Sequence, residues 1–424
     1  MKRTWYPLDN AAKIYPPVSS SRRGGMFALS ARLTEKVNPE ILNETVNTLL
    51  ERFPMFKVRL KRGVFWYYLE ENNRPFKVEP EDAYFMRFIG DTQSNEYLFR
   101  VMYREDKITV CFFHCLCDGT GGLNFFKALL AEYLKLRGFD IKTEGLVISE
   151  NSPHTEGEVE DTFLREFHKP KIKTKKEVNA FKTDGTPFDS DGCGIITGKV
   201  KVDELKELCK KYNATISEYI SALYMYCIYK ECIKNRKVKN KNISILVPVN
   251  MRKVYPSETM RNFALFARLT HNWENEISFE DCVETCKTQL HEGIQKDKLD
   301  AIIYSNVKVE KNFILKIMPL FIKDVAMRIA YKHVGDNLHT ANMSNLGYVN
   351  LPESMSKYVK DIVFNLGTSF SCKTHCAVVG YNNNLYITFS RAFVENKIER
   401  EFFRMLTSSG VGVTLFSNYW EEKL

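Results

Sequence analysis

The feature that most constrains the fold is an apolar strand that runs directly into a helix. Residues 96–116 alternate like two strands joined at Glu105–Asp106, and the second strand is apolar up to His114. A glycine-rich turn follows, and residues 122–138 carry apolar side chains at helical spacing. This order of elements predicts mixed α/β structure, in which functional groups commonly lie where a strand ends.

The length of 424 residues predicts two domains, because a single hydrophobic core stops growing at about 250–300 residues. Residues 1–150 carry a first series of strand and helix patterns. Residues 151–192 are polar, contain prolines and show no sustained apolar period, as a linker does. Residues 193–424 carry a second series. The sequence therefore predicts an α/β fold, or two-layer α+β fold, in which each half is a mixed β-sheet flanked by helices.

Charge and hydropathy exclude several classes of protein. The net charge of +9 is modest for this length and does not indicate nucleic-acid binding, although it would favour a phosphorylated cofactor or an acidic carrier protein. No window of 18 residues is uncharged and apolar, so no transmembrane segment is expected. The N-terminus has no apolar signal core, and we therefore expect a cytoplasmic protein whose eleven cysteines are reduced thiols.

The most apolar long stretch is residues 312–330, which contains Lys316, Lys323, Asp324 and Arg328. At 100° per residue these charges fall on one side of a helix. The pattern predicts a half-buried amphipathic helix, and such helices ordinarily turn their apolar side to the core. A role at a membrane surface is the lesser alternative.

The stretch CFFHCLCDGTGG, residues 111–122, permits three chemical roles. On a straight strand Cys111, Cys115 and Cys117 share one face at about 6.5–7 Å per two residues, which cannot surround a zinc ion tetrahedrally. No metal site is therefore predicted. A thiol nucleophile is also disfavoured, because neighbouring residues on a strand point to opposite faces and Cys115 adjoins His114.

The third role is a lone histidine at the end of a strand. His114 could serve as a general base at the floor of a cleft, with Asp118 pairing with an arginine elsewhere to fix the turn. The alternative is a hydrogen-bonded core histidine followed by a helix-capping aspartate. The residues alone leave these two interpretations open.

His114, Asp118 and Gly119 form the pattern HxxxDG, which resembles the motif of the CoA-dependent acyltransferase superfamily. Chloramphenicol acetyltransferases, plant-type acyltransferases, alcohol acetyltransferases and peptide-synthetase condensation domains are members. Phe113 stands where condensation domains usually have another histidine, which makes amide formation on a peptidyl carrier less expected.

Further segments extend the resemblance over most of the chain. ERFPMFKVRL at 51–60 resembles an early helix-to-strand segment of the superfamily. ILVPVNMRKVYPSETMRNFALFARL at 245–269 and SNLGYVNLP at 344–352 resemble elements of bacterial alcohol acetyltransferase-like proteins, which are the closest group. The resemblance implies two chloramphenicol-acetyltransferase-like domains with a tunnel between them.

The resemblance also implies roles for the charged residues of the motif. His114 would be the general base, acting without metal or acyl-enzyme. Asp118 would be structural and would pair with an arginine, for which Arg252 is the first choice and Arg59 the second. Gly119 is expected at a sharp turn that needs a positive φ.

Four other residues complete the predicted site. Gly121 and Gly122 are expected to let a substrate approach the backbone. Ser344 or Asn345 is expected to donate a hydrogen bond to the oxyanion of the tetrahedral intermediate, and a turn residue bonded to its own backbone is the alternative.

The predicted function is transfer of an acyl group, acetyl in the first instance, from acyl-CoA to a hydroxyl of a small-molecule acceptor. No bound cofactor is expected, and acyl-CoA is the co-substrate. The alternatives are condensation-type transfer from an acyl carrier protein, giving an ester or an amide, and a non-catalytic degenerate member.

Overall fold

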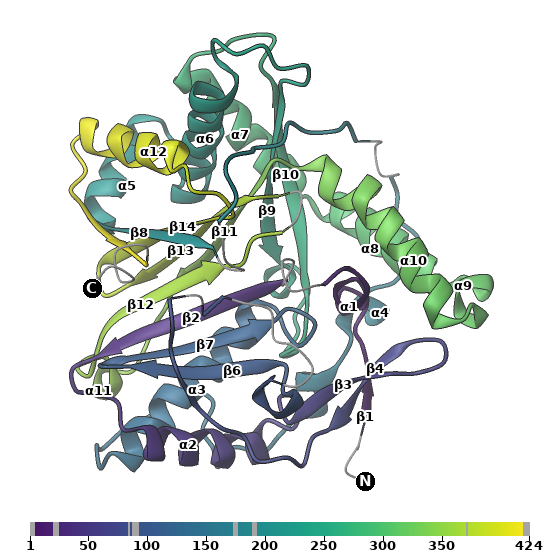
Figure 1. Ribbon diagram of the computed structural model, residues 1–424, viewed down its shortest axis with the longest axis vertical. Coiled ribbons are helices and arrows are strands. Elements are labelled where there is room, and N and C mark those ends of the chain that lie inside the picture. Colours follow the sequence, from purple (N-terminus) through teal and green to yellow (C-terminus); the bar gives the residue numbers. More distant parts are fainter. Residues whose placement is uncertain are drawn as a thin grey trace.

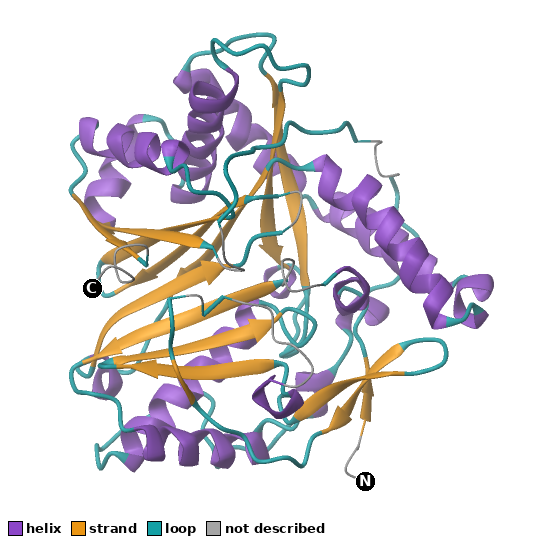
Figure 2. Cartoon of the chain, viewed as in Figure 1, coloured by secondary structure: helices purple, strands orange, loops and turns teal. Residues whose placement is uncertain are grey.

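The computed structural model describes residues 5–19, 25–83, 85–86, 93–172, 177–188, 193–369 and 372–418. This part of the chain forms three β-sheets with helices packed on them (Figures 1 and 2). The α/β fold class predicted from the sequence is confirmed. Parts of the predicted linker, at 173–176 and 189–192, lie outside the described residues.

The first sheet has five strands in the order β12-β2-β7-β6-β5. They are β2 (Met26–Leu33), β5 (Glu79–Pro80), β6 (Phe99–Arg104), β7 (Lys107–Phe113) and β12 (Val359–Leu366). Helices α2 (Pro39–Arg52) and α3 (Gly119–Leu136) cover one face of this sheet (Figure 1). The core between them is aromatic: Phe56 and Phe125 stack with ring centroids 4.4 Å apart.

The second sheet has seven strands in the order β10-β9-β11-β13-β14-β8-β15. They are β8 (Gly194–Lys201), β9 (Asn242–Asn250), β10 (Ala264–Asn272), β11 (Ala341–Tyr348), β13 (Thr374–Tyr381), β14 (Asn384–Arg391) and β15 (Val413–Ser417). The helices gathered on this sheet are α5 (Val202–Lys211), α6 (Ile216–Ile228), α7 (Phe279–Gly293) and α12 (Lys397–Ser408) (Figure 1).

The remaining elements lie beside the two large sheets. A small sheet consists of β1 (Trp5–Pro7), β4 (Tyr67–Glu71) and β3 (Val58–Arg62). The other helices are α1 (Tyr15–Val18), α4 (Thr162–Arg165), α8 (Lys296–Lys311), α9 (Phe313–Ile317), α10 (Leu320–Ala330) and α11 (Glu353–Ser356). None of the helices in the described ranges is long and apolar enough to cross a membrane.

Strand β12 joins the two halves of the molecule. It pairs antiparallel with β2, from Val359 opposite Leu33 to Leu366 opposite Phe27, although it belongs to the second half of the sequence. Asp361 on β12 also accepts a hydrogen bond from Lys199 on β8 at 3.0 Å. The five-stranded sheet is thus completed from outside residues 1–150. The division at 1–150, 151–192 and 193–424 stays a prediction.

Local sequence signals account for several boundaries. A capping box begins α6: the Thr215 side chain accepts from the Glu218 N–H, and the Glu218 carboxylate accepts from the Thr215 N–H. Asn382 and Asn383 form the hairpin turn that joins β13 to β14, with φ of 46° and 54°. Asparagine tolerates these left-handed angles, which the twist of a hairpin favours.

The helix predicted over 312–330 is interrupted. It divides into α9 and α10 at Pro319, because a proline disfavours helical angles in the residue before it, and Met318 is extended at φ −65° and ψ 128°. Helix α8, which precedes this pair, was not predicted, although Leu299, Ile303 and Val307 recur at helical spacing on its buried side.

Candidate active site

His114 lies in the turn that follows β7, one residue past the end of the strand at Phe113. Its backbone N–H donates to the Gly25 carbonyl at 2.8 Å, which holds the turn against the start of β2. The imidazole stacks on Tyr15, with ring centroids 4.8 Å apart and an interplanar angle of 15°. Phe27 meets it edge-on at 5.3 Å. The ring is therefore held by aromatic neighbours on two sides.

Asn262 determines which nitrogen of the His114 ring carries hydrogen. Nδ1 of His114 lies 2.9 Å from Oδ1 of Asn262. The amide nitrogen of Asn262 lies 3.1 Å from Oδ2 of Asp9, and a carboxylate only accepts. The amide oxygen must then face the ring, so the neutral imidazole carries its hydrogen on Nδ1. Nε2 is left with the basic lone pair.

The surroundings of His114 favour the neutral ring. Burial is the largest effect, and it lowers the pKa of His114 below its ordinary value. The negative charges of Asp118 and Asp9 and the hydrogen bond to Asn262 oppose this shift without overcoming it. The imidazole is therefore a proton acceptor at neutral pH.

Asp118 pairs with the arginine that the sequence suggested first. Nη1 of Arg252 lies 2.7 Å from Oδ2 of Asp118, and Nη2 lies 3.2 Å from Oδ1, which is a bidentate geometry. Both side chains are largely buried. Arg59, the second candidate, lies on β3 and pairs instead with Glu70 and Glu96, at 2.7 and 2.9 Å.

Asp118 also caps helix α3. Oδ1 accepts from the backbone N–H groups of Thr120 and Gly121 at 3.1 and 3.0 Å, and Oδ2 accepts from the Phe263 N–H at 2.8 Å. The carboxylate thus meets three backbone donors in addition to Arg252. The sequence-based alternatives of an ion pair and a helix cap are therefore both present in one residue.

Three consecutive residues, 261–263, tie the histidine to the ion pair. The Arg261 carbonyl accepts from Arg252, the Asn262 side chain bonds His114, and the Phe263 N–H bonds Asp118. The sequence pattern singled out residues 245–269 but did not indicate a role for Asn262. The available signal was the Arg-Asn dipeptide shortly after the PVNMR strand.

The expectation of a positive φ at Gly119 was wrong. Gly119 is the first residue of α3, and it is absent from the described residues with left-handed backbone. The chain turns instead at Asp118, whose backbone is extended at φ −89° and ψ −179°, a conformation open to any residue.

Gly121 and Gly122 provide close packing for the start of α3. A Cβ on Gly121 would lie 2.0 Å from the carbonyl oxygen of Met260, and one on Gly122 would lie 2.8 Å from the Phe27 ring. These contacts are sufficient reason for glycine at both positions. Substrate binding by Gly119, Gly121 and Gly122 stays a prediction.

Ser344 and Asn345 lie on β11, in the seven-stranded sheet. The Asn345 amide donates to the Ser217 hydroxyl at 2.9 Å. The next residue, Leu346, comes within 3.0 Å of the position of a Cβ on Gly119. The fold therefore brings this end of β11 against the start of α3. Oxyanion stabilisation by either residue stays a prediction.

The cysteines of the motif are packing residues. Cys111, Cys115 and Cys117 are fully buried, and Cys115 and Cys117 lie in the turn rather than on the strand assumed from the sequence. Burial raises the pKa of the Cys111 thiol to about 12 and raises the pKa values of the other two thiols well above their ordinary value, so none is a ready nucleophile. In the described ranges no cluster of His, Cys, Asp and Glu could hold a metal ion.

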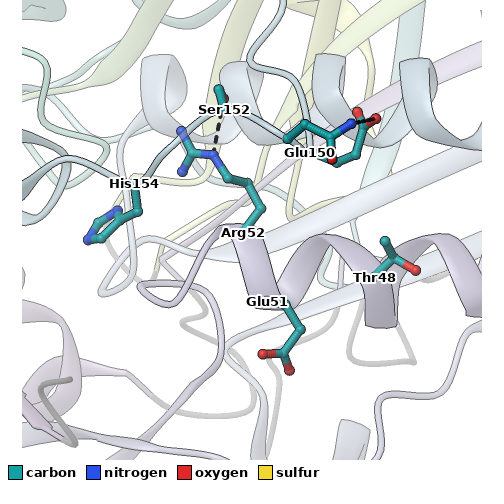
Figure 3. Close-up of a pocket in the computed structure, with 7 residues that line it drawn as sticks. Thr48, Glu51, Arg52, Glu150, Ser152 and His154 are labelled. Atoms are coloured by element: carbon teal, nitrogen blue, oxygen red, sulfur yellow. Dashed lines mark hydrogen bonds between the residues drawn. The ribbon is translucent and has the colours of Figure 1, made fainter.

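A surface pocket of about 390 Å³ lies between the end of α2 and residues 150–154 (Figure 3). Arg52 enters it, bonds Ser152 at 3.2 Å and forms a bidentate pair with Glu158 at 2.7 and 2.9 Å. The lining residues are Thr48, Glu51, Arg52, Glu150, Asn151, Ser152 and His154. None of them belongs to the predicted site, so this pocket is separate from it.

Three solved structures show which class of protein has this fold. Polyketide synthase associated protein 5 from Mycobacterium tuberculosis is 13% identical, with 95% of this chain and 96% of that chain covered at a TM-score of 0.58. Trichothecene 15-O-acetyltransferase from Fusarium sporotrichioides is 10% identical, with 96% of this chain and 94% of that chain covered at a TM-score of 0.60. A starter condensation domain of rhizomide synthetase, solved with C8-CoA and Leu-SNAC, is 11% identical. The match covers 95% of this chain and 93% of that chain at a TM-score of 0.55.

The fold is therefore the two-domain fold shared by CoA-dependent acyltransferases and condensation domains. A family model described as alcohol acetyltransferase matches residues 160–409, more than half of the 424 residues. The chain belongs to the alcohol acetyltransferase family, and thus to the CoA-dependent acyltransferase superfamily. No curated protein matches it.

The ion pair gives a test of stability. We expect Asp118→Asn to lower the free energy of unfolding by about 3–5 kcal/mol, because it leaves the Arg252 charge buried without a counter-charge. Urea unfolding followed by circular dichroism measures this loss. Glu207→Gln, in the exposed pair with Lys210, is the control and should not move the midpoint. An unchanged midpoint for Asp118→Asn would contradict the structural role.

The packing of α3 gives a second test. Gly121→Ala is expected to lower stability by about 1–3 kcal/mol, because its methyl group collides with the Met260 carbonyl. Gly412→Ala is the matched control, since the nearest atom to a Cβ there is a side-chain oxygen of Glu204 at 3.4 Å and no backbone atom stands in the way. The melting temperatures of both variants, measured by thermal unfolding, test this prediction. Equal melting temperatures would contradict close packing at Gly121.

Proposed function

We propose that this protein transfers an acyl group, with acetyl as the first choice, from a CoA thioester to a hydroxyl of a small-molecule acceptor. The observation that carries the proposal is a neutral His114 imidazole, held at Nδ1 by Asn262 at 2.9 Å, four residues before a buried Asp118–Arg252 pair. Membership of the alcohol acetyltransferase family supports acyl transfer. The similarity to a named O-acetyltransferase supports an oxygen acceptor.

In the proposed mechanism Nε2 of His114 removes the proton of the acceptor hydroxyl. The hydroxyl oxygen attacks the thioester carbonyl at the same time. The imidazolium then returns the proton as the tetrahedral intermediate expels the CoA thiolate, so the products are an ester and free CoA. Asn262 and Asp9 keep the ring in the productive tautomer. No acyl-enzyme forms, and Asp118 acts only by holding the turn.

The remaining parts of the proposal concern the substrates. Acyl-CoA is a co-substrate that enters a tunnel between the two halves, and the protein acts in the cytoplasm without a resident cofactor. Ser344 or Asn345 donates to the oxyanion, in keeping with the approach of β11 to the start of α3. The second candidate is an acyl carrier protein as donor, and the similarity to the condensation domain of a polyketide synthase supports it.

Thiol release from acetyl-CoA in the presence of a panel of alcohols tests the function. We expect His114→Ala to lower kcat/KM by about 10²–10⁴-fold, the usual contribution of general acid–base catalysis. His271→Ala, at the end of β10, is the control and should keep full activity. Activity only with acyl-loaded carrier protein would favour the second candidate. No release with either donor, or full activity of His114→Ala, would overturn the proposal.

The lowered pKa of His114 predicts the pH dependence of the reaction. A base must be neutral to act, so kcat/KM should stay constant near neutrality and fall as the pH drops through the pKa of the free enzyme. Because burial lowers that pKa, the midpoint should lie below the ordinary value of about 6.5. Initial rates measured from about pH 4.5 to pH 8 locate it. An acid limb centred above about 6.5 would contradict a buried base.

A further inference from the structure

Helix α10 packs with its polar side inward and its apolar side outward. Lys323 and Asp324 are only 2% and 3% exposed, whereas Phe321, Val325 and Ile329 are 64%, 54% and 57% exposed. The expectation that this amphipathic helix turns its apolar side to the core was therefore wrong. The reversal means that a row of large apolar side chains faces outward from the described chain.

Specific contacts hold the helix in this orientation. The Lys323 ammonium lies 3.4 Å from the centroid of the Trp66 ring, a cation–π contact. The Asp324 carboxylate accepts from the Tyr67 hydroxyl and from Arg62, both at 3.0 Å. These partners lie on the β3–β4 hairpin, more than 250 residues earlier in the chain. Tertiary contacts between distant parts of the sequence therefore keep the apolar side of α10 outward.

The exposed apolar surface continues beyond α10. Its members, which we call the helical apolar patch, are Phe313, Ile314 and Ile317 on α9 and Phe321, Val325 and Ile329 on α10. The three residues on α9 are 72%, 66% and 53% exposed. Val64, at the adjoining hairpin turn, is 72% exposed, and its carbonyl accepts from the Leu320 N–H at 2.8 Å. Figure 1 shows α9 and α10 at one edge of the molecule.

The exposed charged side chains in the segment that carries the patch have one sign. Residues 305–333 contain two carboxylates, and both are engaged by other parts of the chain. Asp324 is buried, and Glu310 is paired with Lys13 and Asn10. The exposed charged side chains of this segment are Lys308, Lys311, Lys316, Arg328 and Lys332, all of them cations. An exposed apolar patch whose own segment carries only exposed cations is complementary to a surface that is both apolar and anionic.

We propose that the helical apolar patch docks on the surface of an anionic lipid bilayer, with the phenylalanine and isoleucine side chains entering the interface and the cations contacting lipid phosphates. A second copy of the chain fits less well, because a two-fold interface would bring the same cations together. A protein partner is also less favoured, since lysine is depleted from protein interfaces and abundant on membrane-surface helices. The proposal does not depend on the acyl-transfer function.

Cosedimentation of the full-length protein with vesicles tests the proposal. We expect binding to phosphatidylcholine vesicles that contain about one third phosphatidylserine, weak binding to pure phosphatidylcholine, and release in about 0.5 M NaCl. Phe313→Ser with Phe321→Ser should lower the partition coefficient at least about tenfold, because two large apolar side chains no longer enter the bilayer. Lys316→Glu with Lys332→Glu should lower it on anionic vesicles only.

Leu415→Ser with Phe416→Ser is the matched control, since these residues are 55% and 44% exposed on β15. This variant should bind vesicles like the unaltered protein. Equal melting temperatures show that all variants fold. The measurement is vesicle binding alone, so its outcome does not depend on acyl transfer from acetyl-CoA. The proposal is overturned if the unaltered protein ignores both vesicles, or if Phe313→Ser with Phe321→Ser binds undiminished. It is also overturned if that variant instead abolishes a dimer or the binding of an acidic carrier protein.

Discussion

The buried ion pair between Asp118 and Arg252 is the interaction on which the site depends. It joins Asp118, the N-cap of α3, to Arg252 in the short helical turn that follows β9 of the other sheet, at 2.7 Å. Burying two charges costs several kcal/mol, which is repaid only when their other polar atoms are also bonded. Asp118 meets that requirement with three backbone N–H groups, and Arg252 with two backbone carbonyls. The pair therefore anchors the turn, with little freedom left to act on a substrate.

The proposed catalytic base is positioned by the same short segment. Residues 261–263 reach Arg252, His114 and Asp118 in turn. The orientation of His114 and the Asp118–Arg252 contact between the two halves are thus linked, because a shift of this segment would disturb both. A base held in one tautomer and kept neutral by burial suits proton transfer near neutral pH.

The proposed chemistry and the proposed docking surface use different parts of the molecule. The site lies where β7 meets α3, whereas the helical apolar patch lies on α9 and α10 beside the β3–β4 hairpin. If both proposals hold, an acyltransferase of this family would act beside a bilayer, where apolar acceptor alcohols are concentrated. Each can fail without the other, because binding and thiol release are measured separately.

Much of this protein was determined by local sequence. The apolar strand ending at His114, the helix beginning after Asp118, the capping box and the Asn-Asn hairpin turn all follow from neighbouring residues. The PVNMR segment also singled out Arg252. Only the tertiary structure brought Asp9 to Asn262, across 253 residues, and added β12 to the first sheet. It also decided the orientation of α10. Periodicity shows that a helix has an apolar side, but the direction of that side depends on partners such as Trp66, which lie far away in the chain.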